Sequence, residues 1–598
     1  PFAVSLLLCL PALAQMPKSH PEIADPGRRR AASQLTEKVA GRASTPVAPV
    51  ARRNFIDQHI FGAMEKDRIP HAPLAGDEEF FRRIHIDFTG RIPDDESLRA
   101  FTASTDASKR DKLIDSLAAG HAFRAKWTYW FGDLAMAAAN RVGNEGKNIF
   151  YRWIYDNLQI NRPFNELVAD LLTASAVSNW YTGPASYVAR WVVIGLTCED
   201  TVHEDTADEL AIMASRHFLG LNLQCVSCHD GARHTEKINL WLTARKRNEL
   251  WKQAAFFGKT RVLRRVEIAT TQDEYSIDEK APGYDASART VVRIPRNGPK
   301  GMLDPAFILT GERPDPAKPW RAEFARMLTS HPQFARATVN RFWAEMFGVG
   351  IVDPVDDFDL LRQDPKNPPP APWTLQPTHP ELLDALADDF RNNGYDVQRL
   401  LKLMAKSSAY QLSSRFPREW KEQYSRYFAR KFVRRLKAEE VYDSIVQATG
   451  LVNLVPIRGT DYRARYATET RSPEDFKGRS EALKDINFFL ESFGQNNREF
   501  KERTNDGDIT QAVLLMNSPF VLSQVKAQPA SYLSRMLHMQ PSITDAQLIE
   551  RLFQRFLVRN PSSEELALVK DLIATDRKRG FEDLQWLLLN KVEFVFNY

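Results

Sequence analysis

The sequence predicts a mainly α-helical protein in which two helical domains are joined by a small β-containing connector. Apolar residues recur at helical spacing through most of the chain, and β-branched runs are confined to one stretch. The length of 598 residues exceeds that of a typical single domain. We therefore expect a helical domain over 51–259, the connector over 260–318 and a second helical domain over 319–598.

The first domain is expected to be helical throughout. Gly220 should end the helix before the most specific motif of the chain, and Asp205 or Thr206 should cap the start of that helix. The periodic apolar positions predict helices near 55–64, 79–86, 93–101, 109–117, 123–139, 149–158, 164–172, 205–219 and 241–257.

The connector and the second domain differ in their patterns. The connector has the β-branched residues of short strands at Val262, Val266, Ile268 and the run 291–294. A proline-rich loop at 365–380 interrupts the second domain. Helices are predicted there at 334–347, 381–391, 397–409, 438–448, 509–521, 545–556 and 563–573.

The chain starts with an export-type segment. An apolar run over 2–10 precedes Ala12, Leu13 and Ala14, an A-x-A cleavage pattern before Gln15. Residues 1–14 are interpreted as a signal peptide, and 15–50, rich in Pro, Ala, Ser and charge, as a flexible linker. No later stretch reaches the ~20 apolar residues of a membrane helix. We expect a periplasmic, cell-surface or secreted protein without a transmembrane segment.

The charge of the chain argues against one class of function, and its cysteine count is considered as evidence for disulfides or haem. The formal net charge of +5, from 81 Lys and Arg against 76 Asp and Glu, is spread along the chain, so nucleic-acid binding is not expected. Cys9 would leave with the signal peptide, and Cys198, Cys225 and Cys228 would remain. Haem attachment and a single disulfide would each leave Cys198 unpaired, so the count does not separate them.

The most specific motif is C-x-x-C-H at Cys225, Cys228 and His229. It marks covalent c-type haem attachment, in which each thiol forms a thioether to a haem vinyl group and the adjacent histidine binds the iron. The attachment chemistry takes place outside the cytoplasm, in agreement with an exported chain. We predict one covalent haem c, anchored by the two cysteines, with His229 as the proximal ligand.

Other interpretations of the motif stay open. A C-x-x-C pair alone can form a disulfide or a redox pair. The nearby His234 makes a zinc site another alternative. However, Cys228 and His229 are neighbours and cannot easily point at one metal. The motif could also have no such role.

The distal iron ligand is not determined by the sequence. Met302 is a candidate because Gly301 and Pro305 place it in a loop context like that of many cytochrome methionine ligands. His203 and His217 are further candidates, whereas His234 follows the motif too closely to reach the opposite haem face easily.

No other familiar catalytic set is found: G-x-S-x-G, H-E-x-x-H, P-loop and G-x-G-x-x-G patterns are missing. The acidic string Asp353, Asp356, Asp357 and Asp359 lacks the glycine and closing glutamate of a calcium loop and is interpreted as a loop cap or solvated turn. Acidic residues and a histidine over 199–205 could bind a metal, but helix capping explains much of that cluster.

Several segments together carry a family resemblance. In the first half these are RIHIDFTGRIP at 83–93, NRPF at 161–164, FLGLNLQCVSCHD at 218–230 and AAFF at 254–257. In the second half they are FARATVNRFW at 334–343, VDPVDD at 352–357, HPELLD at 379–384, SAYQLS at 408–413 and EFVFNY at 593–598. The chain resembles exported planctomycete-type cytochrome-c-like proteins that pair domain-of-unknown-function families 1549 and 1553. Many members continue after the motif with a His-Pro pair, whereas residues 231–234 here are Gly-Ala-Arg-His.

The resemblance implies export and a haem c site at Cys225, Cys228 and His229, but it implies no reaction. We therefore expect an exported c-type haem protein that performs outer-sphere electron transfer with a redox partner that the sequence does not identify. Two rival hypotheses are a haem-free surface or carbohydrate-associated binding protein and a haem enzyme with an open iron site. Whether the protein is an enzyme is left undecided.

Overall fold

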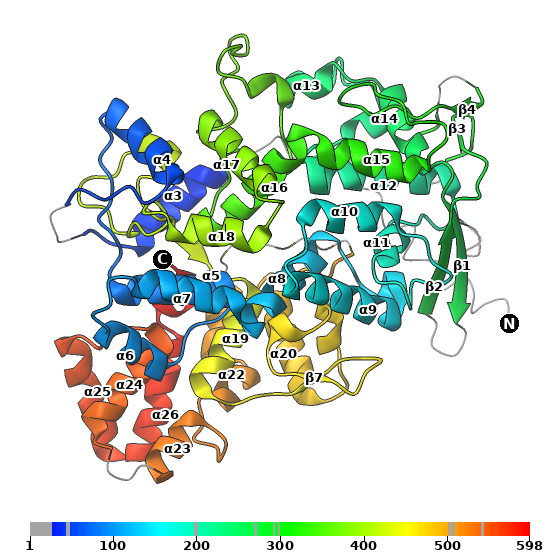
Figure 1. Ribbon diagram of the computed structural model, residues 1–598. Coiled ribbons are helices and arrows are strands. Elements are labelled where there is room, and N and C mark those ends of the chain that lie inside the picture. Colours follow the sequence, from blue (N-terminus) through cyan, green and yellow to red (C-terminus); the bar gives the residue numbers. More distant parts are fainter. Residues whose placement is uncertain are drawn as a thin grey trace. The chain divides into compact units, whose positions relative to one another are not determined.

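The computed structural model describes residues 27–43, 48–195, 201–267, 272–290, 294–296, 300–499, 501, 503, 507, 509–539 and 543–598. Helices dominate these residues and the strands form only two-stranded sheets, so the predicted mainly α class is confirmed (Figure 1). The chain forms two compact units. Of the described residues, the first unit contains 27–30 and Phe131–Leu401, and the second contains Ala31–Trp130 and Lys402–Tyr598.

The first unit is helical except for two small sheets. Its 3-10 helices are η1 (Cys225–Ser227), η2 (Ala255–Phe257) and η3 (Leu360–Arg362). Its strands are β1 (Arg261–Glu267), β2 (Gln272–Asp278), β3 (Tyr284–Asp285) and β4 (Met302–Leu303). Its α-helices are α9 (Ala139–Gln159), α10 (Phe164–Thr173), α11 (Ala185–Arg190), α12 (His203–Leu219), α13 (Leu240–Thr243), α14 (Arg247–Ala254), α15 (Trp320–Ser330), α16 (Pro332–Phe347) and α17 (Pro380–Asn392).

Helix α12 packs against α14 and α16 in the first unit. In the same unit, Phe164 stacks with Phe334 at a centroid distance of 5.8 Å and lies tilted against Phe131 at 5.6 Å. Antiparallel β1 and β2 form a hairpin, and β3 pairs with β4, so the connector contains the short strands that were predicted. Residues 268 and 291–293, which were part of that prediction, lie outside the described residues.

The second unit combines helices from both ends of the chain. Its 3-10 helices are η4 (Glu422–Tyr427), η5 (Ala467–Glu469), η6 (Pro473–Phe476) and η7 (Val592–Val595), and its strands are β5 (Arg434–Arg435), β6 (Val455–Pro456), β7 (Arg463–Ala464) and β8 (Phe596–Asn597). Its α-helices are α4 (Phe55–Lys66), α5 (Asp77–Thr89), α6 (Asp95–Ala103), α7 (Lys109–Ala119), α19 (Ala438–Thr449), α20 (Glu481–Ser492), α21 (Ile509–Asn517), α22 (Pro519–Gln524), α23 (Tyr532–Met539), α24 (Asp545–Leu557), α25 (Ser563–Thr575) and α26 (Arg577–Leu589).

In the second unit, α19 packs against α20, α22, α23 and α24. Strand β5 pairs with β8, so Arg434 lies opposite Asn597. The chain passes between the units within α3 (Gly27–Val39), α8 (His121–Leu134) and α18 (Val397–Lys406). The predicted domains 51–259 and 319–598 follow the order of the chain, and their boundaries stay a prediction. In the part of the chain that the structure describes, no helix is both long and apolar enough to cross a membrane.

Several predicted helices have different bounds in the structure. The single helix expected over 123–139 is wrong, because α8 ends at Leu134, Met136 has a positive φ of 52°, and α9 begins after it. The continuous helix over 509–521 is also wrong: α21 ends at Asn517, and Pro519, which has no N–H to donate, starts α22. The helix over 241–257 likewise divides into α13, α14 and η2.

The segment expected as a flexible linker contains α3. Its Ser33 and Thr36 side chains are fully buried. Ser33 Oγ accepts a hydrogen bond from Trp420 Nε1 at 2.7 Å, and Thr36 Oγ1 accepts one from the Val433 N–H at 2.9 Å. The composition of this segment favours disorder, but contacts with residues far along the chain order it.

Candidate functional site

The C-x-x-C-H motif lies on the loop that follows α12. The helix ends at Gly220, whose φ of 65° lies in the left-handed region that favours glycine. A Cβ at this position would lie 2.7 Å from Cδ2 of Phe358. The carbonyl of Gly220 accepts a hydrogen bond from the Phe358 N–H at 2.9 Å. The loop is therefore fixed to the acidic segment 353–359 at its first residue.

Cys225 and Cys228 lie at the two ends of the turn formed by η1. The carbonyl of Cys225 accepts a hydrogen bond from the Cys228 N–H at 3.2 Å. This bond closes one turn that begins at Cys225 and ends at Cys228, the residue after η1. Both are free and half-buried. The sequence-predicted anchors thus lie within one turn, with His229 as the next residue.

The imidazole of His229 is oriented by the backbone. Its Nδ1 lies 2.8 Å from the carbonyl oxygen of Asp230. A carbonyl can only accept, so Nδ1 is the donor in this contact, and Nε2 is the ring nitrogen that could bind a metal. The ring also stacks on His234, with centroids 3.9 Å apart and planes inclined by 30°.

Arg247 holds the motif loop against a distant segment. It donates from Nε to the Ser227 carbonyl at 3.1 Å. It also donates from Nη1 to Pro295 O at 3.0 Å and from Nη2 to Ile294 O at 2.7 Å. Its backbone N–H donates to Asp230 Oδ1 at 2.8 Å. One side chain therefore joins the turn between the two cysteines to residues 294–295.

Replacing Arg247 with alanine is expected to loosen the motif loop while the unit stays folded. Hydrogen bonds from a charged donor contribute about 1.5–3 kcal/mol each, and a loss of about 1.4 kcal/mol raises the open fraction of the loop roughly tenfold. Alkylation of Cys225 and Cys228 in the haem-free chain by iodoacetamide, followed by mass spectrometry, should be faster by at least that factor.

Two matched variants accompany this measurement. Arg247→Lys keeps the charge but lacks the planar guanidinium group that donates to several carbonyls at once. Its alkylation rate should therefore fall between those of the alanine variant and the native chain. Lys237→Ala removes an exposed cation from the same loop and should leave the rate unchanged. Equal rates in Arg247→Ala and Lys237→Ala would show that Arg247 does not hold the loop.

A buried ion cluster fixes the other side of the segment that Arg247 contacts. Arg296 Nη2 lies 2.7 Å from both Asp205 Oδ1 and Asp208 Oδ2. Its Nε donates to the Tyr284 hydroxyl at 2.9 Å, and that hydroxyl donates to Asp208 at 2.8 Å. Burial lowers the pKa of Arg296, but the two carboxylates outweigh it and raise the pKa. The connector is therefore attached to α12 through ionised groups.

The predicted cap of α12 is wrong. The helix begins at His203 with Val202 in the capping position and no side-chain cap. Asp205 instead forms an ion pair with Arg296, and Thr206 Oγ1 accepts a hydrogen bond from the Val193 N–H at 3.0 Å. The carboxylate considered for a metal at 199–205 thus has a cationic partner. Residues 199 and 200 of that cluster lie outside the described residues.

The acidic string does not form one solvated turn. Asp356 Oδ2 forms an ion pair with Arg216 Nε on α12 at 2.6 Å. Asp359 is a cap, as predicted: it accepts from the N–H of Leu361 at 3.2 Å and from the N–H of Leu240 at 2.8 Å. These contacts bring segment 353–359 against both α12 and α13.

The Asp357 carboxyl has a shifted pKa and in turn affects the pKa of Cys225 in the motif loop. Burial, followed by the charge of Asp356, raises the pKa of the Asp357 carboxyl to about 6. Its Oδ1 lies 3.5 Å from Asn239 Nδ2. Burial, followed by the Asp357 carboxylate, in turn raises the pKa of the Cys225 thiol. The surroundings therefore favour the protonated thiol at this position.

The structure places the distal-ligand candidates at separate positions. Met302 lies on β4 with 58% of its side chain exposed. His203 Nε2 donates to two backbone carbonyls, those of Gly258 and Gly283, at 2.8 and 2.9 Å. None of the contacts described for these two residues involves the motif. Cys198, the third cysteine expected in the mature chain, lies outside the described residues.

His217 has a different environment. It is buried, its Nδ1 lies 3.1 Å from the Tyr187 hydroxyl, and it lines a small apolar cavity with Phe131 and Phe150. Burial lowers the pKa of His217 well below its usual value. Among the described residues, no group of three or more His, Cys, Asp or Glu side chains is arranged to hold a metal ion.

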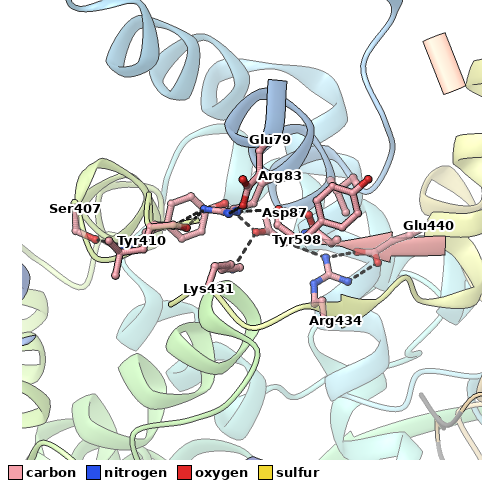
Figure 2. A network of polar contacts seen from close by, with 12 residues as sticks. Glu79, Arg83, Asp87, Ser407, Tyr410, Lys431, Arg434, Glu440 and Tyr598 are labelled. Carbon is pink, nitrogen blue, oxygen red and sulfur yellow. Dashed lines mark hydrogen bonds and ion pairs between the residues drawn. The ribbon is translucent and has the colours of Figure 1, made fainter. Parts of the chain in front are cut away.

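Sequence reasoning missed a second constellation, a buried ionic network around Asp87 in the second unit (Figure 2). Asp87 is 1% exposed. Its carboxylate accepts hydrogen bonds from Arg434 Nη2 at 2.9 Å, the Tyr410 hydroxyl at 2.8 Å and Asn597 Nδ2 at 2.7 Å. Lys431 Nζ lies 3.6 Å away. Four separate segments of the chain therefore meet on one carboxylate.

The neighbouring turn of α5 extends the Asp87 network. Arg83 donates to the carbonyls of Tyr410 and Leu412 at 2.7 and 2.9 Å and to Glu79 at 2.8 Å (Figure 2). Arg83 and Asp87 are four residues apart and lie on the same face as Phe80 and Ile84. Charges placed on an apolar helix face are the sequence signal that could have revealed the network.

Burial sets unusual protonation equilibria in the Asp87 network. Burial lowers the pKa of Lys431 to about 7 and that of Lys126 to about 8, with Asp87 opposing the shift in both. Burial would raise the pKa of Asp87, but the surrounding cations, led by Lys431, lower it. Because these groups are buried, we assign the network to the stability of the second unit.

Two family models match the chain. PSCyt2, a protein family of unknown function (DUF1549), matches residues 55–268, and PSD1, a protein family of unknown function (DUF1553), matches residues 320–573. Each match covers one segment of the chain, with the PSCyt2 segment before the PSD1 segment. No curated protein and no solved structure gives a significant match.

The two family segments meet within each compact unit. In the first unit the bond between Gly220 and Phe358 joins the PSCyt2 and PSD1 segments. In the second unit Asp87 belongs to the PSCyt2 segment, and Tyr410 and Arg434 belong to the PSD1 segment. The pairing of the two families in one chain therefore has a physical counterpart in shared buried contacts.

Proposed function

We propose that the C-x-x-C-H loop carries a covalently bound haem c and that the protein transfers electrons by an outer-sphere route. The observation that carries the proposal is the orientation of His229, whose Nδ1 donates to the Asp230 carbonyl and leaves Nε2 available for iron. A histidine ligand whose other ring nitrogen is held in this way has a defined tautomer and ring direction.

The residues present fit the covalent group. Cys225 and Cys228 are free thiols at the two ends of one turn, which suits two thioether bonds to one porphyrin. Bound haem would supply a one-electron iron couple. The chain's own residues would hold it: the two cysteines as anchors, His229 as the proximal ligand, and Arg247 as the side chain that keeps the loop in place.

Export is part of the same proposal. The apolar run over 2–10 and the Ala-x-Ala pattern at 12–14 support a signal peptide, and periplasmic, cell-surface or secreted localisation agrees with haem c attachment. The distal ligand belongs to the proposal as well, with Met302 as a candidate. Its test is Met302→Leu, which should change the absorption spectrum only if the methionine binds iron.

The deciding experiment is expression of the full chain with c-type maturation machinery. We expect a haem stain that survives denaturing electrophoresis, an intact mass increased by one haem, and a sharp low-spin absorption spectrum. A high-spin spectrum would instead support an open iron site, and a chain without covalent haem would contradict the proposal.

Matched cysteine variants make that experiment specific. Cys225→Ser combined with Cys228→Ser should abolish the covalent stain completely, because no thioether can form. Cys198→Ser changes the third cysteine that remains after signal removal and should keep the stain at the native level. Loss of the stain in Cys198→Ser with retention in the double variant would refute the assignment of the anchors.

A further inference from the structure

The Asp357 carboxylate is the member of the acidic string whose charge is least compensated. Asp356 forms an ion pair with Arg216 at 2.6 Å, and Asp359 accepts hydrogen bonds from backbone N–H groups at 2.8 and 3.0 Å. No cation of the described residues lies within ion-pair distance of Asp357, whose Oδ1 has a long 3.5 Å contact with the neutral amide of Asn239. Asp357 therefore presents a negative charge to its surroundings.

Backbone contacts hold Asp357 beside the motif loop. Its carbonyl accepts a hydrogen bond from Gln376 Nε2 at 2.8 Å. The next residue, Phe358, donates to the Gly220 carbonyl at 2.9 Å and accepts from Asn239 Nδ2 at 3.1 Å. Gly220 and Asn239 flank the segment that contains the C-x-x-C-H motif. Both ends of that segment are therefore hydrogen-bonded to the residue that follows Asp357.

The charge of Asp357 acts on the motif itself. It follows burial as a cause of the raised pKa of the Cys225 thiol, because a carboxylate opposes a second negative charge nearby. An added electron is also a negative charge, so the same carboxylate opposes the reduction of a group held at Cys225. Asp357 is half-buried, so its carboxyl can exchange a proton with solvent while water screens its charge only in part.

Charged and titratable groups on the neighbouring elements set the proton affinity of Asp357. They are Asp356 and Asp359 on the same segment, Arg216 on α12, Arg362 on η3 and Cys225 on η1. Burial, followed by the charge of Asp356, raises the pKa of Asp357 to about 6, and Arg216 opposes the shift. A carboxyl with this pKa changes its protonation near neutral pH when a charge is added close to it.

We propose that the Asp357 carboxylate sets the reduction potential of the haem c site and binds a proton when that site gains an electron. One electron comes from an external donor, and one proton from solvent bonds to a carboxylate oxygen of Asp357. The uncharged acid then offsets the negative charge that the electron adds. The inference rests on the proposed haem c function and gives Asp357 a role beyond the structure of the loop.

Spectroelectrochemical titration of the haem-loaded full chain, with dithionite as the reductant, tests this role between pH 5 and pH 8. The reduced site binds the extra proton, so the reduction potential of the native chain should fall as the pH rises. Asp357→Asn should have a higher potential at pH 8, equivalent to an increase of about threefold or more in the equilibrium constant for reduction. The two chains should converge at pH 5, where the native carboxyl is mostly protonated.

Two further variants show whether the charge of Asp357 causes the effect. Asp357→Glu restores a carboxylate and should return the potential at pH 8 most of the way to the native value. Asp364→Asn removes an exposed carboxylate that contacts Lys366 and Asn367, and it should keep the native potential at every pH. An Asp357→Asn chain with the native potential and the native pH dependence would overturn the inference.

A second measurement uses the haem-free full chain. Asp357→Asn removes a charge that disfavours the Cys225 thiolate, so iodoacetamide should alkylate Cys225 faster at pH 8. The rate is taken relative to Cys228, because loosening of the loop would speed the reaction of both thiols. An unchanged relative rate would also overturn the inference. A native chain that acquires no covalent haem would refute the proposed function, whereas a haem-loaded chain whose potential ignores Asp357→Asn would refute the role of Asp357 alone.

Discussion

Replacing Asp87 with alanine is expected to lower the free energy of unfolding of the second unit by about 3–5 kcal/mol. The change leaves Lys431 buried without the carboxylate that it approaches, leaves Arg434 with Glu440 as its remaining carboxylate partner, and removes the acceptor of the Tyr410 hydroxyl. Uncompensated buried charge costs more than the lost attraction alone. Denaturant titration followed by hydrogen exchange of α5 amides measures the effect.

Two control variants test whether the loss of stability in Asp87→Ala comes from the loss of a buried charge. Asp87→Asn keeps the size and some of the hydrogen bonds but removes the charge, so it should lie between alanine and the native chain. Asp106→Ala removes an exposed partner of Lys112 and should cost much less stability than Asp87→Ala. If Asp87→Ala is no more harmful than Asp106→Ala, the network does not stabilise the unit.

The native chain is expected to gain stability as the pH rises above 7, and Lys431→Met should remove much of this gain. Lys431 has a pKa of about 7 when folded, below the ordinary lysine pKa of 10.5 expected when the chain is unfolded. Between these values the unfolded chain binds one more proton, so the free energy of unfolding rises with pH. The slope from this group approaches about 1.4 kcal/mol per pH unit, and Lys126, with a pKa of about 8, adds to it above pH 8.

Urea titrations between pH 7 and 9 measure that slope. Lys484→Met, which removes an exposed lysine, should keep the native slope. His85, whose pKa burial lowers to about 4, contributes only at lower pH and does not enter this window. A Lys431→Met chain with the full native slope would show that another group is responsible.

Helices with regular apolar spacing were predictable because their burial is periodic along the chain. The predictions over 164–172 and 545–556 agree closely with α10 and α24. The errors lie where a local signal competes with that pattern, as at Pro519, or where contacts from elsewhere order a polar segment, as for Ser33 and Thr36 in α3.

The candidate site also contains some residues that could be predicted from the sequence and others that could not. The positions of Cys225, Cys228 and His229 follow from sequence spacing, since a C-x-x-C-H run needs only one turn to place the thiols together. Asp205 was interpreted as a helix cap or as part of a metal cluster until the structure placed Arg296 beside it. Arg247 carries no sequence signal at all, because its carbonyl partners are backbone atoms of remote residues.

The sequence by itself determined the helical class, the family pairing and the three residues proposed to hold haem, because each depends on patterns within a few residues or a few turns. Only the tertiary structure decided which charges are buried together, such as Asp87 with Lys431 and Arg434. The physical reason is that desolvation and pairing depend on distances between segments far apart in the chain, and residue spacing does not encode those distances.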